Sequence, residues 1–223
     1  MLIILAFHLL GIAFALRQDG MSGRAAFRMF SVVIATHDSE RALVPTLAAL
    51  VAGATAGIVR EVIIADGGSR DATCEIADGA GCRVLTSTQP RGARLKAAAD
   101  AARGPWLLFL APGTVPNVTW VDETRRFIEE AELRGYAAAC AAAFRPDWTP
   151  FQSPLVEAWA LLRTALGARP KAGQGLLIAK TFYEALGGHR GVEAPETDLL
   201  RRIGRRPILL LKCGAAAAVG KNI

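Results

Sequence analysis

A buried apolar strand followed by a helical stretch recurs along the first half of the chain, and this repeat constrains the fold more than any other feature. The runs FSVVIAT (30–36) and EVIIAD (61–66) are rich in β-branched residues, as is typical of strands buried on both faces. CRVLTS (82–87) and WLLFLA (106–111) have the same character. Strands that alternate with helices predict right-handed βαβ units, so we expect an α/β fold with a doubly wound, mostly parallel sheet.

The helical stretches between these strands have recognisable starts. Asp38-Ser39-Glu40 is expected to cap the first helix and Asp71 the second, while Arg91-Gly92 introduces an Ala-rich helix over 93–102. The first helix has its apolar residues at helical spacing, namely Leu43, Leu47 and Leu50. Helices of this kind are expected to cover both faces of the sheet.

The composition and net charge of the chain indicate which classes of partner this protein could bind. The chain has 223 residues, 52% of them hydrophobic, which is enough for one sizeable core. Its net charge of +6 favours anionic partners. Nucleic acid is not expected, because the sequence has no surface patch of interleaved aromatic and basic residues. Four cysteines without C-x-x-C spacing predict neither zinc nor a disulfide framework, and they fit a reducing, cytoplasmic setting.

The first 28 residues form an apolar N-terminal extension ahead of the first strand. The run MLIILAFHLLGIAFAL (1–16) is shorter than a membrane-spanning helix, and no Lys or Arg precedes it as in a secretory signal. An over-extended start site and a segment lying on a membrane surface therefore both rank above secretion. Residues 29–223 are expected to form a single domain, with a nucleotide-binding half at 29–116 and an acceptor half at 117–223.

In sheets of this kind ligands bind beyond the carboxyl ends of the strands. Charged residues and glycines gather there in this sequence, at 36–40, 66–71 and 89–96. Asp66 ends a strand and is followed by two glycines that let a ligand approach the backbone, which suits hydrogen bonding to a base or ribose. A turn with a capping aspartate is the alternative interpretation.

Five segments in order together resemble the bacterial family 2 glycosyltransferases of GT-A fold, which transfer sugars from nucleotide-diphospho-sugars. Members of the most similar branch read approximately S-V-V-I-P-T-x-N-E, D-G-G-S-x-D-x-T and R-G-x-Q-x-N-x-G-A. The resemblance covers residue 31 to about 206. The segments of this chain that carry it are SVVIATHDSE, EVIIADGGSRDAT, RGARLKAAADAARGPWLLFL, GQGLLIAKTFYEALGGHRG and PETDLLRRIGRR.

The resemblance implies a donor site at the carboxyl edge of the first strands. The base and ribose would meet Asp66 with Gly67, and Thr36, Asp38 and Glu40 would line the same pocket. The diphosphate would pass the cationic residues of the third segment, because guanidinium groups donate two parallel hydrogen bonds to phosphate. A solvated helix start is the alternative for these cations, which are Arg91, Arg94 and Lys96.

The resemblance also implies an acceptor side. Glu196 or Asp198 would deprotonate the acceptor hydroxyl, although acidic residues also favour a helix N-terminus for purely structural reasons. Gln174 and Trp159 would contact a sugar or lipid acceptor. Trp159 lies in an amphipathic stretch within 145–171, for which core packing and a membrane surface are both alternatives.

One turn departs from the family pattern. The related enzymes end their fourth strand in an acid-x-acid turn whose carboxylates hold a divalent cation, Mg²⁺ or Mn²⁺, beside the departing diphosphate. This chain has Ala111, Pro112 and Gly113 at those positions, and their side chains cannot ligate a hard cation. No metal ligand is predicted here.

Two functions therefore follow from the sequence. The first is an inverting, metal-independent glycosyltransferase that uses fixed positive charge to stabilise its leaving diphosphate. It would be cytoplasmic or associated with the inner membrane, and it would serve cell-envelope polysaccharide synthesis. The second is a GT-A-fold protein that binds a nucleotide or a partner without turnover.

Overall fold

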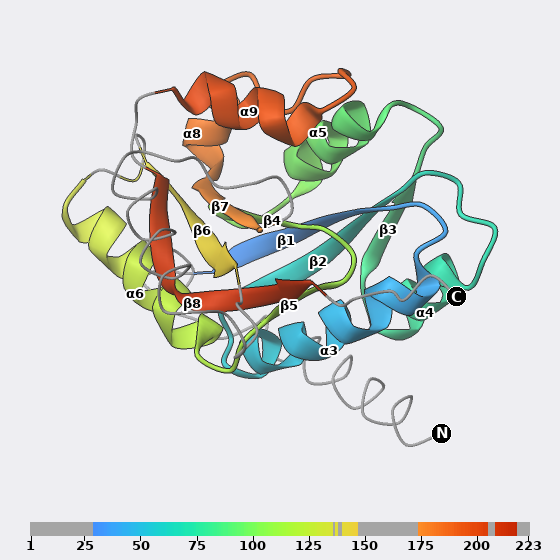
Figure 1. Cartoon of the computed structure of the whole chain (residues 1–223), viewed down its shortest axis with the longest axis horizontal. Helices are drawn as coiled ribbons and strands as arrows, with labels where there is room; N and C mark the ends of the chain where they lie inside the picture. The colour runs from blue at the N-terminus through green and yellow to red at the C-terminus, as the bar shows by residue number, and fades with distance from the viewer. Residues whose placement is uncertain (1–28, 136, 138–139, 147–173, 205–207, 218–223) are drawn as a thin grey trace, which may run out of the picture.

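The computed structural model describes residues 29–135, 137, 140–146, 174–204 and 208–217, and within them it shows one eight-stranded sheet with helices on both faces (Figure 1). Trp159, most of the amphipathic stretch at 145–171, and the extension at 1–28 lie outside the described residues. In chain order the elements are β1 (Phe30–Thr36), α3 (Glu40–Thr55), β2 (Val59–Asp66), α4 (Thr73–Gly79), β3 (Arg83–Thr86), α5 (Arg91–Ala101), β4 (Trp106–Leu110), β5 (Thr114–Pro116), α6 (Trp120–Leu133), β6 (Ala141–Pro146), β7 (Leu176–Ala179), α8 (Lys180–Ala185), α9 (Pro195–Ile203) and β8 (Ile208–Ala217).

The sheet has the strand order β3-β2-β1-β4-β7-β6-β8-β5. The first four strands of the chain are parallel to one another, and β6 is parallel to β8, whereas the pairs β4·β7, β6·β7 and β5·β8 are antiparallel. The chain moves outward from β1 to β2 and β3 and then returns past them to β4. This reversal creates a topological switch point between β1 and β4, where ligands bind in sheets of this type.

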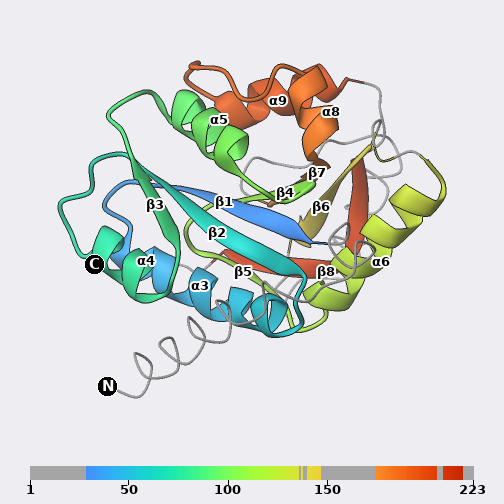
Figure 2. The same ribbon diagram turned by 180° about the vertical axis from the view of Figure 1, so that it is seen from behind.

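The helices form two layers. Figures 1 and 2 show α3, α4 and α6 on one face of the sheet and α5, α8 and α9 on the other. This distribution follows from right-handed crossovers, since the connections to β2 and β3 run one way along the sheet and the connection to β4 runs the other way. The predicted α/β class, with helices on both faces of a doubly wound sheet, is confirmed.

The strands form the centre of the core because they are apolar on both faces. Every residue of β1 and β4 is buried, and Leu43, Leu47 and Leu50 of α3 belong to the same hydrophobic core. The predicted elements are found with shifts at their ends: β2 begins at Val59, β3 is limited to Arg83–Thr86, and α5 begins at Arg91.

Candidate functional site

The carboxyl ends of the first strands bring the predicted site residues to one edge of the sheet. Thr36 and Asp66 are register partners at the ends of β1 and β2, and Ile34 is paired with Leu110 at the end of β4. The antiparallel strand β7 begins at the same edge, because Leu176 is paired with Phe109. The switch point is therefore bordered by the loops after β1 and β2 and by the turn after β4.

Asp66 is fully buried, and its carboxylate holds the following loop in shape. Oδ1 accepts hydrogen bonds from the hydroxyls of Thr36 (3.0 Å) and Ser69 (2.5 Å). Oδ2 accepts from the backbone N–H groups of Gly68 (2.8 Å) and Ser69 (2.9 Å). Burial alone raises the pKa of this carboxyl, but these hydrogen bonds to the ionised form outweigh it and lower the pKa from 3.8 to about 2.

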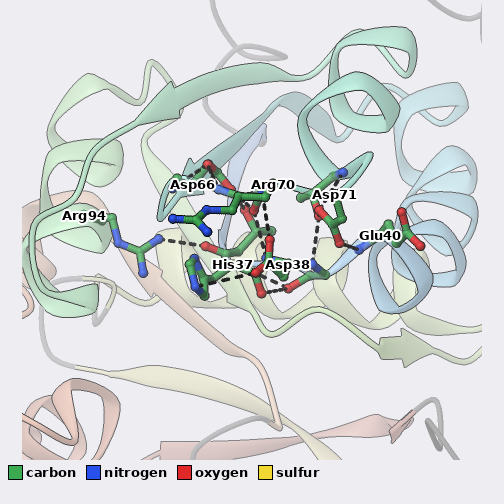
Figure 3. Close-up of polar contacts among 12 residues, drawn as sticks. His37, Asp38, Glu40, Asp66, Arg70, Asp71 and Arg94 are labelled. Atoms are coloured by element: carbon green, nitrogen blue, oxygen red, sulfur yellow. Dashed lines mark hydrogen bonds and ion pairs between the residues drawn. The ribbon is translucent and has the colours of Figure 1, made fainter.

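The loops after β1 and β2 are joined by the side chains that the sequence assigns to the nucleotide pocket (Figure 3). Asp38 accepts from the backbone N–H of Arg70 (2.7 Å), and its own N–H donates to the Ser69 hydroxyl (2.9 Å). Glu40 accepts from the N–H of Ala72 (3.2 Å). Asp38 has a φ of 45°, a left-handed conformation that aspartate tolerates better than most residues. The two loops therefore form one rigid unit.

Asp71 serves the starts of two helices instead of one. Its Oδ1 accepts from the backbone N–H of Thr73 (3.0 Å) in α4, as predicted, and its Oδ2 accepts from that of Glu40 (3.0 Å) in α3. Ser39, expected to cap α3 with its side chain, makes no capping hydrogen bond and instead bonds to the backbone of His37. Asp71 thus replaces Ser39 as the side chain that satisfies the first N–H of α3.

Arg94 reaches from the first turn of α5 into the ends of the strands. Its Nη1 donates to the carbonyls of Thr36 (2.8 Å) and Ala65 (2.7 Å), and its Nε donates to that of Gln89 (3.1 Å). A Cβ added at Gly67 would lie 2.8 Å from Nη1, so the guanidinium rests directly against the backbone there. Much of the hydrogen-bonding capacity of Arg94 is used to join β1, β2 and α5.

Arg91 joins α5 to α9. Its Nε donates to Oε1 of Glu196 at 2.7 Å, and both side chains are only partly exposed, at 39% and 26%. Gly92 permits this approach, since an added Cβ would lie 1.7 Å from the carbonyl oxygen of Arg190. The predicted phosphate-binding cation and the predicted catalytic base are therefore brought into direct contact, although 105 residues separate them in the sequence.

Asp198 has a different environment from Glu196. It forms an ion pair with Arg202 one turn later on α9, with Oδ2 2.8 Å from Nη2. Arg202 also donates to the carbonyls of Leu186 and Gly188, and so ties α9 to the turn after α8. Of the two acidic candidates, Glu196 contacts the donor-side cation and Asp198 contacts a structural arginine.

Two further predicted residues, Lys96 and Gln174, have different environments. Lys96 is exposed and forms an ion pair with Asp100 (3.0 Å) along α5. Gln174 is half-buried and directly precedes Gly175, which packs against Leu110 at the end of β4. Gln174 is thus at the same edge as the turn after β4, whereas Lys96 points along the helix surface.

The turn after β4 is held by backbone contacts. Thr114 N–H donates to the carbonyl of Ala111 (3.1 Å), and Gly113 N–H donates to the carbonyl of Ala42 and the hydroxyl of Thr46 in α3, both at 2.9 Å. Gly113 has a φ of 86°, which matches the Pro-Gly pattern of a type II turn. Its shape is therefore fixed without any ionisable side chain.

Two features of the described edge were missed by the sequence interpretation. His189 is buried with a pKa lowered to about 4, mainly because burial disfavours its charged form. Its Nδ1 lies 3.0 Å from the Tyr183 hydroxyl, which also accepts from the His189 N–H (2.9 Å). Arg70 is exposed between Ser69 and Asp71. The double glycine before His189 and the Gly-Gly-Ser before Arg70 are the signals that mark both positions in the sequence.

The comparison with family models decides the classification. The model described as glycosyl transferase family 2 matches residues 31–182, which is more than half of the chain. The chain belongs to glycosyl transferase family 2. This membership agrees with the resemblance seen in the sequence. No curated protein matches it.

Solved structures support the GT-A fold of this family 2 member. The S. aureus protein TarS (1–349) with UDP-GlcNAc has a TM-score of 0.63 at 16% identity, over 85% of this chain and 58% of that one. A Pyrobaculum calidifontis mannosyltransferase with GDP-Man and Mn²⁺ has a TM-score of 0.67 at 16% identity, over 98% and 65%. Glucosyl-3-phosphoglycerate synthase from Mycobacterium tuberculosis has 0.55 at 18%, over 87% and 74%. The chain spans less than two thirds of TarS and of the mannosyltransferase.

The turn after β4 does not fit a divalent cation in this family 2 chain. Ala111, Pro112 and Gly113 have no side-chain oxygen, nitrogen or sulfur to offer a metal. Among the described residues, no group of three or more His, Cys, Asp or Glu side chains is arranged to hold a metal ion. No helix in the described part of the chain is long and apolar enough to cross a membrane.

Proposed function

We propose that this protein transfers a sugar from a nucleotide-diphospho-sugar to an acceptor hydroxyl, with inversion and without a metal held by an acid-x-acid turn. The observation that carries the proposal is the contact of Arg91 with Glu196, at 2.7 Å, beside the strand ends where donors bind in this fold. It joins a phosphate-binding group and a proton acceptor in one place.

The nucleotide would lie against the rigid unit formed by the loops after β1 and β2. The hydrogen bonds of Asp66 to Gly68 and Ser69 fix the loop backbone. A Cβ added at Gly68 would have no atom within 4 Å, so the backbone there is open to a base or ribose. Thr36, Asp38 and Glu40 would shape this pocket chiefly by holding the two loops together. A preformed pocket loses little conformational entropy when the nucleotide binds.

Glu196 would act as the general base. Its Oε1 accepts from Arg91, and the carboxylate is 26% exposed, so Oε2 can take a proton from an acceptor hydroxyl. The acceptor oxygen would then form a bond to the anomeric carbon while the bond from that carbon to the diphosphate oxygen breaks. Attack on the face opposite the leaving group inverts the anomeric configuration. Arg91 orients Glu196 and places positive charge near the leaving diphosphate.

Asp198 is a weaker candidate for the base. Its pairing with Arg202, which is itself bonded to two backbone carbonyls, gives it a role in fixing α9 to the turn after α8. Gln174, two residues before β7, would face the acceptor side. A role for Trp159 there stays a prediction, as do a lipid or sugar acceptor, a bacterial cell-envelope pathway and a cytoplasmic or membrane-associated location.

The alternative is a binding protein without turnover. The observation that favours it is the same turn after β4, which has no carboxylate to hold the metal that the related mannosyltransferase carries in its complex with GDP-Man and Mn²⁺. Under this alternative the Arg91–Glu196 pair is only a structural link between α5 and α9.

The experiment measures release of nucleoside diphosphate from UDP-GlcNAc and GDP-Man, without and with simple sugar acceptors, by wild type, Glu196→Gln and the matched control Glu193→Gln. We expect Glu196→Gln to lower turnover by about 10²- to 10⁴-fold while donor affinity stays unchanged. The control changes an exposed acid in the loop before α9 and should retain activity. Equal turnover in all three proteins would remove Glu196 from the chemistry. Donor binding without turnover in wild type would favour the alternative.

A further inference from the structure

The positive charges predicted to meet the diphosphate are largely engaged within the protein. Arg94 donates to three backbone carbonyls, Lys96 pairs with Asp100, and Arg91 pairs with Glu196. The turn after β4 supplies no metal ligands either. A diphosphate at this edge therefore needs a further cation, and that requirement rests on the proposed donor site.

Arg70 has the position and the freedom that such a cation needs. It lies in the loop after β2, four residues beyond Asp66, and it is exposed. Within the described part of the chain its guanidinium makes no hydrogen bond or ion pair that competes for a ligand. In the view of Figure 3 the side chain extends over the loop toward the side on which His37 and Arg94 lie.

The backbone that carries Arg70 is fixed on both sides. Its own N–H donates to Asp38 Oδ1 at 2.7 Å, and Ser69 before it is held through both its N–H and its hydroxyl by Asp66. Asp71 after it is bonded to the starts of α3 and α4. A rigid backbone that presents an unengaged guanidinium is the arrangement expected of an anion-binding residue, because less freedom is lost on binding.

The neighbouring carboxylates do not neutralise this arginine. Asp66 accepts four hydrogen bonds from the loop and from Thr36, and Asp71 accepts backbone N–H bonds from two helices. Asp38 accepts through Oδ1 from the Arg70 backbone and has Oδ2 3.8 Å from His37 Nε2. The hydrogen-bonding capacity of these carboxylates is used within the loops, and Arg70 is exposed.

We propose that Arg70 binds the diphosphate of the nucleotide donor and supplies the positive charge that a metal supplies at an acid-x-acid turn. The ligand class is a nucleoside diphosphate or its sugar conjugate. A guanidinium can donate two parallel hydrogen bonds to one phosphate or bridge two of them. Arg70 thus acts in donor binding and in stabilising the leaving group, while Arg91 orients the base.

The test compares wild type, Arg70→Ala, Arg70→Lys and the charge-matched control Arg134→Ala in buffer with EDTA. Arg134 is exposed at the end of α6, where it forms a surface ion pair with Glu130. Calorimetry measures the affinities for UDP and GDP, and ligand-observed NMR measures those for uridine and guanosine. We expect Arg70→Ala to lower the affinity for UDP and GDP by about 10- to 100-fold and Arg70→Lys to lower it less. Arg134→Ala should leave this affinity unchanged. Nucleoside binding should not change.

The outcomes separate this inference from the proposed function. Equal diphosphate affinity in wild type and Arg70→Ala overturns the role of Arg70 and leaves the donor site intact. A parallel loss of nucleoside and diphosphate affinity assigns Arg70 a structural role and also overturns the inference. If wild type binds neither UDP nor GDP, both proposals fail together. Thermal unfolding confirms that the variants are folded, and Arg70→Gln serves if the alanine variant is not.

Discussion

Two neighbouring regions at the same edge of the sheet fix their irregular backbone with different kinds of hydrogen bond. The loops after β1 and β2 are held by three carboxylates: Asp38 and Asp71 each accept a backbone N–H from the opposite loop, and Asp66 accepts N–H groups of its own loop and the hydroxyl of Thr36. The turn after β4 has no ionisable side chain, and its Gly113 N–H donates instead to a carbonyl and a hydroxyl of α3.

In the first region the acidic side chains hold the loop backbone, whereas the turn after β4 has no acidic side chain at the positions of the family's acid-x-acid turn. In the first region each carboxylate accepts a backbone N–H group for which the irregular backbone provides no carbonyl partner. In the second region the Pro-Gly turn satisfies its backbone directly, so no side chain is required there. Under the proposed function, a donor diphosphate bound between the two regions would be neutralised by arginine.

Removing the central carboxylate of the first region should have the largest effect. Asp66→Ala leaves the part-buried N–H groups of Gly68 and Ser69 and the hydroxyls of Thr36 and Ser69 without their acceptor, so we expect a loss of about 3 kcal/mol in the free energy of unfolding. Urea denaturation measures it. Asp78→Ala, on the exposed end of α4, is the control and should change stability by less than about 0.5 kcal/mol. A similar small change for Asp66→Ala would show that the loops do not depend on this carboxylate.

Low pH should remove the contribution that Asp66 of the first region makes to the free energy of unfolding. Because the pKa of Asp66 is lowered from 3.8 to about 2 in the folded protein, its contribution is fully present above about pH 4 and is lost as the pH falls through 2. The corresponding loss is about 2 kcal/mol. Unfolding free energies of wild type and Asp66→Asn, measured from pH 5 to pH 2, should converge toward the acid end. Parallel curves would contradict the lowered pKa.

Introducing an acid into the second region should have the smallest effect. Gly113→Asp places a side chain at a φ of 86°, which costs about 1 kcal/mol for a residue other than glycine. We expect no tight Mn²⁺ binding, because position 111 is alanine and a single carboxylate is a poor site. Gly113→Ala is the matched control for the backbone cost. Micromolar Mn²⁺ binding by the aspartate variant alone would mean that the turn retains a nearly complete metal site.

The sequence predicted the fold well because its signals are local. The apolar run FSVVIAT is β1 to the residue, and the spacing of Leu43, Leu47 and Leu50 marks the buried face of α3. Caps were predicted less well, since the choice of Asp71 over Ser39 for α3 depends on a loop thirty residues away. The sheet beyond β4 was not predicted, because its strands are short or Ala-rich and pair out of sequence order.

The site was predictable as a location and not as a set of contacts. Strand ends mark the edge, so Thr36 and Asp66 were expected there. No local pattern shows that Arg94 donates to strand carbonyls or that Arg91 meets Glu196 across 105 residues. Arg70 was passed over because the Gly-Gly-Ser before it marks a turn but says nothing about the arginine itself, whose proposed role depends on the neighbouring cations being engaged.

The most direct test of a donor site that works without an acid-x-acid metal is calorimetric titration of the protein with UDP and GDP, each with EDTA and with Mn²⁺. The account predicts binding of at least one nucleotide with the same affinity, within about threefold, in both conditions. Binding that occurs only with Mn²⁺ would contradict it, and would place metal ligands at a position that the turn after β4 does not provide.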